Sequence, residues 1–320
     1  MNHKQAVIVM LLGIVLVASA PTEADFIVPW GDTNWWGVED VPTGGDFTAI
    51  SAYNDSAIAL RSDGSLASWG PTGSFAPPGN DYVAIAGGAD HSLALKSDGS
   101  IAWWRAAGDM LSGAPVGNDF LAVAAINSSF GRTGLALRSD GSLVAWGEDV
   151  YDILNVPSGN DFAAISGGFE GFALALRLDG SIVGWGNDDG GQTDVPADKD
   201  HVAIAAGNRE GVALKADGSI VDWGNLYGTP LCNDYVSISA HGGTGVALRS
   251  DGSLVGWGAV DDLKNVPLGN TFTAIEVDGG WGLALSTEPY GMTVVPLPSA
   301  ALLSVIGMGY AGMRLRRRTT

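Results

Sequence analysis

The feature that most constrains this chain is a segment that recurs seven times. Its clearest copy is residues 135–147, where apolar residues alternate on either side of Ser-Asp-Gly-Ser and the second half ends in Trp-Gly. Alternation with period two predicts a strand. Asp-Gly between two such runs predicts a two-residue type I′ turn, because glycine supplies the required positive φ. Each copy therefore predicts a β-hairpin.

Three marks define the repeat, and each occurs seven times. They are a strand of the type aromatic-x-Ala-Ile, an Ala-Leu pair and a tryptophan, and successive tryptophans are 34 to 42 residues apart. Self-similarity at this period is typical of propellers and solenoids. The repeat tryptophans are Trp30, Trp69, Trp104, Trp146, Trp185, Trp223 and Trp257.

The apolar runs favour an all-β protein. Turn residues bound every run, and no run has helical spacing. Neighbouring blades of a propeller lie face to face, so we interpret the recurrent alanine of the Ala-Leu pairs as the small residue needed where blades converge near the axis. The tryptophans would then fill the wider space outside. A leucine-rich solenoid is the alternative, but it needs one strand per repeat and a Leu/Asn ladder, and neither is evident here.

The two ends of the repeat region predict a closed ring. The last Ala-Leu pair, at Ala284, is followed by no Asp-Gly turn and no Trp-Gly, whereas residues 26–31 carry a Trp-Gly before the first aromatic strand. Pairing these two pieces would remove the last exposed strand edges. The sequence therefore predicts a seven-bladed β-propeller over residues 26–288, closed by an N-terminal strand.

The repeats, including residues 136–147 and the loop 187–196, resemble bacterial repeats of the regulator of chromosome condensation superfamily. The resemblance covers roughly residues 26–288 and implies a seven-bladed β-propeller. The short repeats are more similar to those of secreted propeller-type β-lactamase inhibitors than to the longer blades of the eukaryotic chromatin protein. The nucleotide-exchange role of that protein is not carried over, because no residue-level match to its site is evident.

The N-terminal end predicts export. Lys4 precedes an apolar run over residues 6–17, and Ala-Ser-Ala follows at residues 18–20. This is the pattern of a secretory signal peptide, which we place at residues 1–20. The apolar run is shorter than the ~20 residues of a membrane span. A retained N-terminal anchor is the alternative.

The C-terminal end, residues 289–320, resembles a PEP-CTERM sorting signal. It has a short proline motif, an apolar stretch over residues 300–313 and a basic terminus. The resemblance implies recognition by a sorting protease of the cell envelope, although a leucine stands where glutamate is commonest. The motif residues are Val295, Pro296, Leu297, Pro298, Arg314, Arg316, Arg317 and Arg318. A single-pass membrane anchor with cytoplasmic arginines is the alternative, and both interpretations predict an exported, envelope-associated protein.

The charge of the chain excludes one class of partner. The net charge is −19, and the two ends, residues 1–20 and 295–320, hold no acidic residue but five of the 16 bases. The remaining residues, 21–294, therefore have 35 acids against 11 bases. A surface this negative repels phosphate backbones, so we expect no nucleic-acid partner.

The sequence shows no convergent set of catalytic or metal-binding groups. The four histidines have no metal-ligand spacing, and the turn aspartates are explained by the turns themselves. The loop 187–194 lacks the ligand spacing of a calcium loop. We therefore expect no catalytic residue, no metal and no cofactor. A recurrent base two residues before each turn aspartate predicts a ring of bases paired with carboxylates, or alternatively an anion-binding ring. These bases are Arg61, Lys96, Arg138, Arg177, Lys215 and Arg249.

Four tryptophans stand outside the repeat column and are our candidate binding surface. Tryptophan is enriched at interface hot spots because it combines apolar area with a polar N–H. These four are Trp35, Trp36, Trp103 and Trp281. The alternative is that Trp35 and Trp36 pack locally over the closing strand. The sequence thus predicts a non-catalytic scaffold or binding module for an unknown protein or envelope polysaccharide. The alternatives are an inhibitor of a secreted enzyme and a lyase or hydrolase with a site at the channel mouth.

Overall fold

The computed structural model describes one of the two compact units of the chain. Those units are Met1–Pro289 and Tyr290–Thr320. The described residues are 25–31, 40–53, 56–70, 76–88, 91–105, 113–128, 131–225, 228–259, 265–278 and 280–289. The predicted signal peptide, Trp35, Trp36 and the predicted sorting signal all lie outside them. Within these ranges, no helix has the length and apolar character that crossing a bilayer requires.

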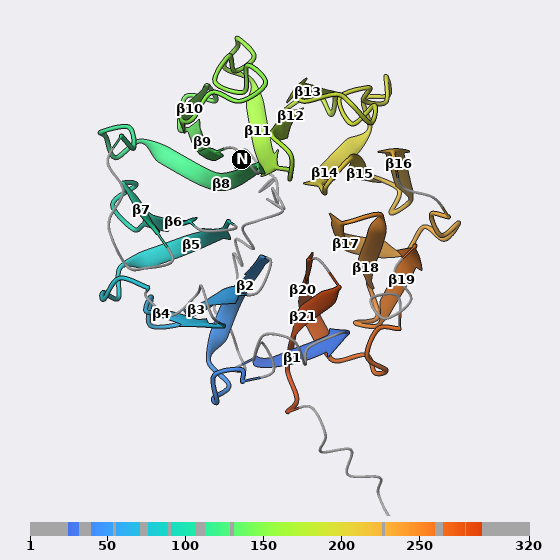
Figure 1. The fold of residues 1–320 in the computed structure, drawn as a ribbon. Helices are drawn as coiled ribbons and strands as arrows, with labels where there is room; N and C mark the ends of the chain where they lie inside the picture. Colours follow the sequence, from blue (N-terminus) through green and yellow to red (C-terminus); the bar gives the residue numbers. More distant parts are fainter. Residues whose placement is uncertain are drawn as a thin grey trace, which may run out of the picture. The chain divides into compact units, whose positions relative to one another are not determined.

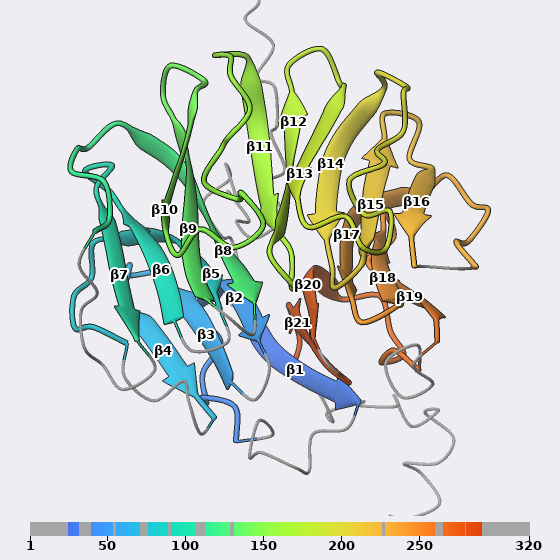
Figure 2. The same cartoon turned by 45° about the horizontal axis from the view of Figure 1, so that its top comes forward.

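The described residues form 21 strands in seven three-stranded antiparallel sheets, arranged as a ring of seven blades (Figures 1 and 2). The strand nearest the axis in each blade is β2 (Phe47–Tyr53), β5 (Tyr82–Gly87), β8 (Phe120–Ser128), β11 (Phe162–Gly167), β14 (His201–Ala206), β17 (Tyr235–His241) or β20 (Phe272–Asp278). The middle strands are β3 (Ser56–Arg61), β6 (His91–Lys96), β9 (Gly131–Arg138), β12 (Phe172–Arg177), β15 (Glu210–Lys215), β18 (Thr244–Arg249) and β21 (Trp281–Ser286). The outer strands are β4 (Leu66–Trp69), β7 (Ile101–Arg105), β10 (Leu143–Gly147), β13 (Ile182–Gly186), β16 (Ile220–Gly224), β19 (Leu254–Gly258) and β1 (Phe26–Gly31). The predicted seven-bladed β-propeller is confirmed.

The seventh blade is assembled from both ends of the repeat region, as predicted. Its sheet has the order β1-β21-β20, and β1 pairs with β21 from Phe26 opposite Ser286 to Gly31 opposite Trp281. The closing strand also contacts the first blade, since the Phe47 amide donates a hydrogen bond to the Asp25 carbonyl at 3.3 Å. The ring therefore has no open side between its first and last blades.

The hairpin turn differs from the predicted type I′ turn. Leu60 is opposite Leu66, the Arg61 amide donates to the Ser65 carbonyl at 2.9 Å, and the Gly64 amide donates to the Arg61 carbonyl at 2.9 Å. Gly64 has a φ of +81°, whereas Asp63 has no positive φ. This is a three-residue loop with glycine in the left-handed region. The prediction was wrong because Asp-Gly suits both turns and only the register separates them.

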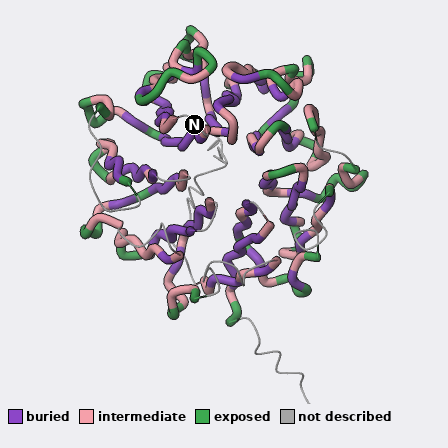
Figure 3. Tube along the Cα trace, in the orientation of Figure 1, coloured by how far each residue is buried: buried purple, intermediate pink, exposed green. Residues whose placement is uncertain are grey.

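The buried residues follow the inner and middle strands (Figure 3). The tryptophans of the repeat lie on the outer strands, as expected. The alanines of the Ala-Leu pairs lie on the middle strands rather than near the axis, and Ala59, Ala94 and Ala136 are fully buried between blades. In four blades the tryptophan faces a glycine. A Cβ added to Gly134, for example, would lie 2.3 Å from the Trp146 ring.

If β1 closes the ring, a single charge buried on this strand should strongly destabilise the fold. Val28 is fully buried and lies opposite Ala284. We expect Val28→Asp to lower the free energy of unfolding by at least about 3 kcal/mol, because an unpaired charge would be buried between blades. Removal of residues 26–31, which leaves the edge of β21 open, is expected to cost several kcal/mol or cause aggregation. Thermal or urea unfolding measures both.

The matched control is Val202→Asp, which places the same charge on a strand residue that is 42% exposed. It should change the free energy of unfolding by no more than about 0.5 kcal/mol. Equal melting of Val28→Asp and Val202→Asp would contradict closure by β1.

Candidate functional site

One face of the ring carries the Ser-Asp-Gly turns, and we name it the turn face. A basic side chain and a carboxylate meet there in each of six blades, and in five of them the base also lies over an aromatic ring. In the third blade, Arg138 Nη1 lies 2.7 Å from Asp119 Oδ2, and the guanidinium lies 4.8 Å from the centroid of Phe120. The other ion pairs are Arg61–Asp46, Lys96–Asp81, Arg177–Asp161, Lys215–Asp200 and Arg249–Asp234. The predicted ring of paired bases is confirmed, and pairing leaves little positive charge for an anion.

The seventh blade departs from this pattern. Thr271 stands at the aspartate position and Ser286 at the basic position, and their hydroxyls are 2.8 Å apart. A neutral hydrogen bond thus replaces the ion pair in the blade that the chain ends share.

The turn face also exposes apolar side chains where the inner strands begin. The second residue of an inner strand is exposed in blades two, three and five, where Val83, Leu121 and Val202 are 40%, 50% and 42% exposed. The loops on this face that lead into the inner strands add Val116 and Leu268, which are almost fully exposed. Packing within the ring does not require these residues, so their side chains are available to a partner.

Two of the four candidate tryptophans lie in the core. Trp281 is 4% exposed and begins the middle strand β21 rather than an inner strand, and Trp103 is 5% exposed. Trp103 packs edge-on against Trp146, with ring centroids 5.8 Å apart. This corrects the expectation that Trp103 and Trp281 belong to an exposed binding surface, because both faces of a blade are covered by its neighbours. That Trp35 and Trp36 belong to a binding surface stays a prediction, because both lie outside the described residues.

Three rings from non-adjacent blades meet over the opposite end of the channel. Tyr53 ends the first inner strand, Phe169 follows β11, and His241 ends β17. Each pair of ring centroids is 6.1 Å apart. Blades one, four and six are not neighbours in the ring, so side chains from all three can contact one another only over the central axis. We call these three residues the aromatic plug.

Charged groups lie beside the aromatic plug. His241 Nδ1 is 2.9 Å from Asp278 Oδ1, and Asp278 is 1% exposed. Burial disfavours the imidazolium, but the carboxylates of Asp278 and, further off, Glu210 outweigh it and raise the pKa of His241. Glu210 accepts hydrogen bonds from the amides of Gly243 at 3.0 Å and Arg209 at 2.8 Å, which satisfies its buried charge. The sequence showed no convergent set of such groups, and the fold brings these three together from separate blades.

A cavity of about 70 Å³ lies in the channel and is lined by residues from all seven inner strands. All of its lining residues are serine, alanine or glycine except Glu276 on β20. Burial, and then the neighbouring Asp278 carboxylate, raises the pKa of Glu276 to about 8. Sequence reasoning missed this residue. The available signal was its column in the repeat, where every other blade has serine or alanine.

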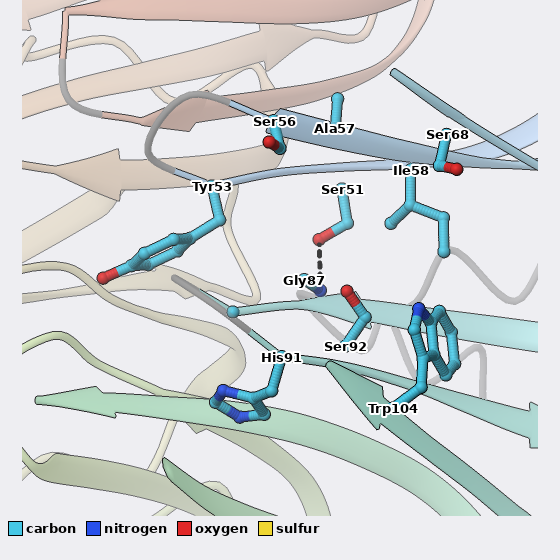
Figure 4. A pocket seen from close by; sticks show the side chains of 11 residues that line it. Ser51, Tyr53, Ser56, Ala57, Ile58, Ser68, Gly87, His91, Ser92 and Trp104 are labelled. Atoms are coloured by element: carbon cyan, nitrogen blue, oxygen red, sulfur yellow. Dashed lines mark hydrogen bonds between the residues drawn. The ribbon is translucent and has the colours of Figure 1, made fainter. Parts of the chain in front are cut away.

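A smaller cavity, of about 20 Å³, lies between the first two blades (Figure 4). Ser51 Oγ accepts a hydrogen bond from the Gly87 amide at 2.9 Å across this gap. His91 and Trp104 of the second blade line the cavity and are 1% and 3% exposed. Its size suits about one water molecule rather than an organic ligand.

One group of side chains in the described part of the chain has metal-ligand spacing. The ligand atoms of Asp198, Asp200 and His201 lie within 4.8 Å of one another. Lys215 Nζ already lies 2.7 Å from Asp198 and 3.5 Å from Asp200, and His201 Nδ1 is 3.0 Å from the Gly180 carbonyl. The lysine ammonium therefore takes the place that a cation would need, and the group belongs to the ring of ion pairs.

Comparison with known proteins bears on the fold. No family model and no curated protein matches the sequence. Among solved structures, Prp20p of Saccharomyces cerevisiae, the yeast RCC1, has a TM-score of 0.66 at 15% identity and covers 84% of this chain and 93% of its own. Human WBSCR16 has a TM-score of 0.62 at 12% identity, with 77% and 88% covered. The ectodomain of the Physcomitrella patens receptor kinase CR4 has a TM-score of 0.59 at 19% identity, with 73% and 69% covered.

These likenesses define the class of protein as a β-propeller. Within that class, the architecture is RCC1-like, with seven blades closed by a strand from the other end of the repeat region. At such identities the likeness concerns the fold alone.

The ion pairs of the turn face predict a modest, salt-sensitive contribution to stability. We expect a double-mutant cycle with Arg138→Met and Asp119→Asn to give a coupling energy of about 0.5 to 1 kcal/mol, because both side chains are partly exposed. About 1 M salt should reduce that energy, since it shortens the Debye length to about 3 Å. Urea unfolding measures the cycle, and a coupling that salt leaves unchanged would contradict an electrostatic origin.

Glu276 predicts a stability difference that grows with pH. The carboxyl stays protonated in the folded chain up to about pH 8, whereas in the unfolded chain it ionises near its ordinary pKa of 4.5. Rising pH within this window therefore favours the unfolded state. We expect Glu276→Gln and the parent to melt at the same temperature near pH 4.5. Between pH 4.5 and about pH 8 the variant should melt at an increasingly higher temperature than the parent, and above that pH the difference should stay constant.

The control for this pH series is Glu288→Gln, which changes an exposed carboxylate of the same blade. Its melting temperature should follow that of the parent chain throughout. A pH-independent difference between Glu276→Gln and the parent would show that Glu276 titrates normally in the folded chain.

Proposed function

We propose that this chain is an exported, non-catalytic β-propeller that binds a protein partner through its turn face. The observation that carries the proposal is the set of exposed apolar residues on that face, with Val83, Leu121 and Val202 near the starts of three inner strands. Because the inner strands gain nothing in packing from these side chains, their apolar character supports contact with a partner.

The charge around these residues supports a partner with basic groups. The turn aspartates accept hydrogen bonds from the serine two residues further on, and these bonds lower the pKa of Asp63, Asp98, Asp140, Asp217 and Asp251. They therefore remain ionised around the apolar surface at neutral and mildly acidic pH. A partner with an apolar centre and a basic rim is complementary to this face.

The similar structures give further support. Prp20p is described by its binding to Gsp1p and histones, and in another structure yeast RCC1 is bound to Kap60. Those partners belong to the yeast protein. What they support for this chain is the use of an RCC1-like ring as a binding scaffold.

An enzyme is the second candidate function, and one observation favours it. His241 and Asp278 form an oriented imidazole–carboxylate pair near a channel mouth. The imidazole packs against Tyr53 and Phe169, so a substrate would first have to displace the aromatic plug. The binding role needs no such rearrangement. An inhibitor of a secreted enzyme would use the same turn face and falls within the proposed binding role.

Binding through the turn face is tested with a triple variant, Val83→Asp, Leu121→Asp and Val202→Asp. Chemical cross-linking on envelope fractions should trap a partner with the parent chain, and the triple variant should lose at least about 90% of that product. The matched control is Tyr151→Asp, which changes an exposed residue that lies beside Gly171, near the aromatic plug. Equal cross-linking by the triple variant would contradict the proposed surface.

Export completes the proposal. A signal peptide over residues 1–20 and a C-terminal sorting signal or membrane anchor over residues 289–320 would place the ring outside the cytoplasm. Protease treatment of intact cells should digest the ring or release it, and a fusion to a topology reporter should be active only on the outer side. Recovery of the intact ring from the cytosol alone would contradict export.

A further inference from the structure

The fifth residue of each inner strand lines the central channel, and it is small in six of the seven blades. The seven residues of this column are Ser51, Ala86, Ala124, Ser166, Ala205, Ser239 and Glu276. Side chains alternate along a strand, so this column and the seventh column, with Tyr53, His241 and Asp278, share one side of the inner strands. The cavity is thus lined by small side chains and one carboxylate, and the aromatic plug lies at one end of it.

The serines of the channel have a structural role that Glu276 does not share. Each serine hydroxyl accepts a hydrogen bond from an amide of the next inner strand: Ser51 from Gly87 at 2.9 Å, Ser166 from Ala206 at 3.0 Å and Ser239 from Val277 at 3.1 Å. Glu276 has no hydrogen bond and no ion pair with any residue that the structure describes. Glu276 is partly buried and its carboxylate faces the channel cavity, so no protein group offsets the partial loss of water around its charge.

The surroundings of Glu276 are negative. Asp278, two residues further on, keeps Oδ2 buried without a hydrogen-bond partner, while its Oδ1 faces His241. Among the described residues, the charges that act on His241 and Glu276 are the carboxylates of Asp278 and Glu210, so three acids lie near one base, and the aromatic plug adds the Tyr53 hydroxyl. The channel therefore favours a positively charged occupant.

We propose that the central channel binds a slender primary ammonium group, either a free alkylamine or a lysine side chain of a partner, with Glu276 as its receptor. An ammonium donates three hydrogen bonds to a carboxylate and to neighbouring oxygens. Ala86, Ala124 and Ala205 present apolar walls that suit a methylene stem. A calcium ion is disfavoured, because it takes six to eight oxygen ligands and the channel serines already accept amide hydrogens.

The site would act independently of the turn-face binding proposed above. Its ligand replaces water around Glu276 with a charge-assisted hydrogen bond, which is about twice as strong as a neutral one. Because the ammonium stabilises the ionised carboxylate, binding near neutral pH should release a proton from Glu276.

The test is calorimetric titration of the full chain with n-butylamine, with 1-butanol as the neutral analogue of the same length. We expect saturable butylamine binding, no saturable butanol binding, and proton release at pH 7 that disappears near pH 9. Glu276→Gln should weaken butylamine binding at least about tenfold, and Glu288→Gln should leave it unchanged. Equal binding of butanol, or of butylamine to Glu276→Gln, would overturn the proposal.

Two further arms complete the experiment. Nα-acetyl-lysine amide, whose ammonium sits on a four-carbon stem, separates the two sources: binding at least as tight as that of butylamine indicates a lysine side chain, and weaker binding indicates a free amine. Calcium or tetramethylammonium binding more tightly than butylamine would contradict the slender ammonium site. Thermal unfolding of Glu276→Gln confirms that a lost signal reflects the channel and not loss of the fold.

Discussion

The pairing of β1 with β21 is the interaction on which the ring depends. Every other blade takes its three strands from one continuous stretch, whereas the seventh needs a strand from the opposite end of the repeat region. The Asp25 carbonyl takes over the role of the turn glycines, whose carbonyls accept the first amide of the next inner strand in the other blades. The closing strand thus restores both the sheet and the contact between blades, so the chain ends constrain the whole ring.

The contacts between blades explain why the fold tolerates an acidic surface. The recurring backbone bond from the inner strand to the preceding turn is short-ranged and independent of charge, and buried alanine and leucine fill the space between sheets. The ion pairs lie at the rim of this arrangement and are partly exposed, so each adds little. Stability is therefore carried by burial and backbone pairing, and the surface charges remain free to serve binding and solubility.

Much of the fold could be predicted from the sequence because three marks recur in every blade. They predicted the strands, the number of blades and the closure. The three marks could not distinguish a two-residue turn from a three-residue turn, because both accept Asp-Gly. They also could not show which strand lies nearest the axis, because inner and middle strands are equally apolar. Trp103 and Trp281 were misplaced for a related reason: a tryptophan outside the repeat column can still pack between blades, as Trp103 does against Trp146. The aromatic plug was missed because contact across the axis joins residues from distant blades, whereas Glu276 could have been found from its column in the repeat.

Glu276 shows how a repeat scaffold can carry a specific site. A residue in most columns must satisfy packing against the next blade, and the serines and alanines of the fifth column do so. The side chain of Glu276 contributes no bond among the described residues, and its burial opposes ionisation. A carboxylate at such a position lowers stability in the empty ring, whereas alanine or serine would not. The ammonium site proposed above would give this carboxylate a role, because its charge becomes favourable on binding.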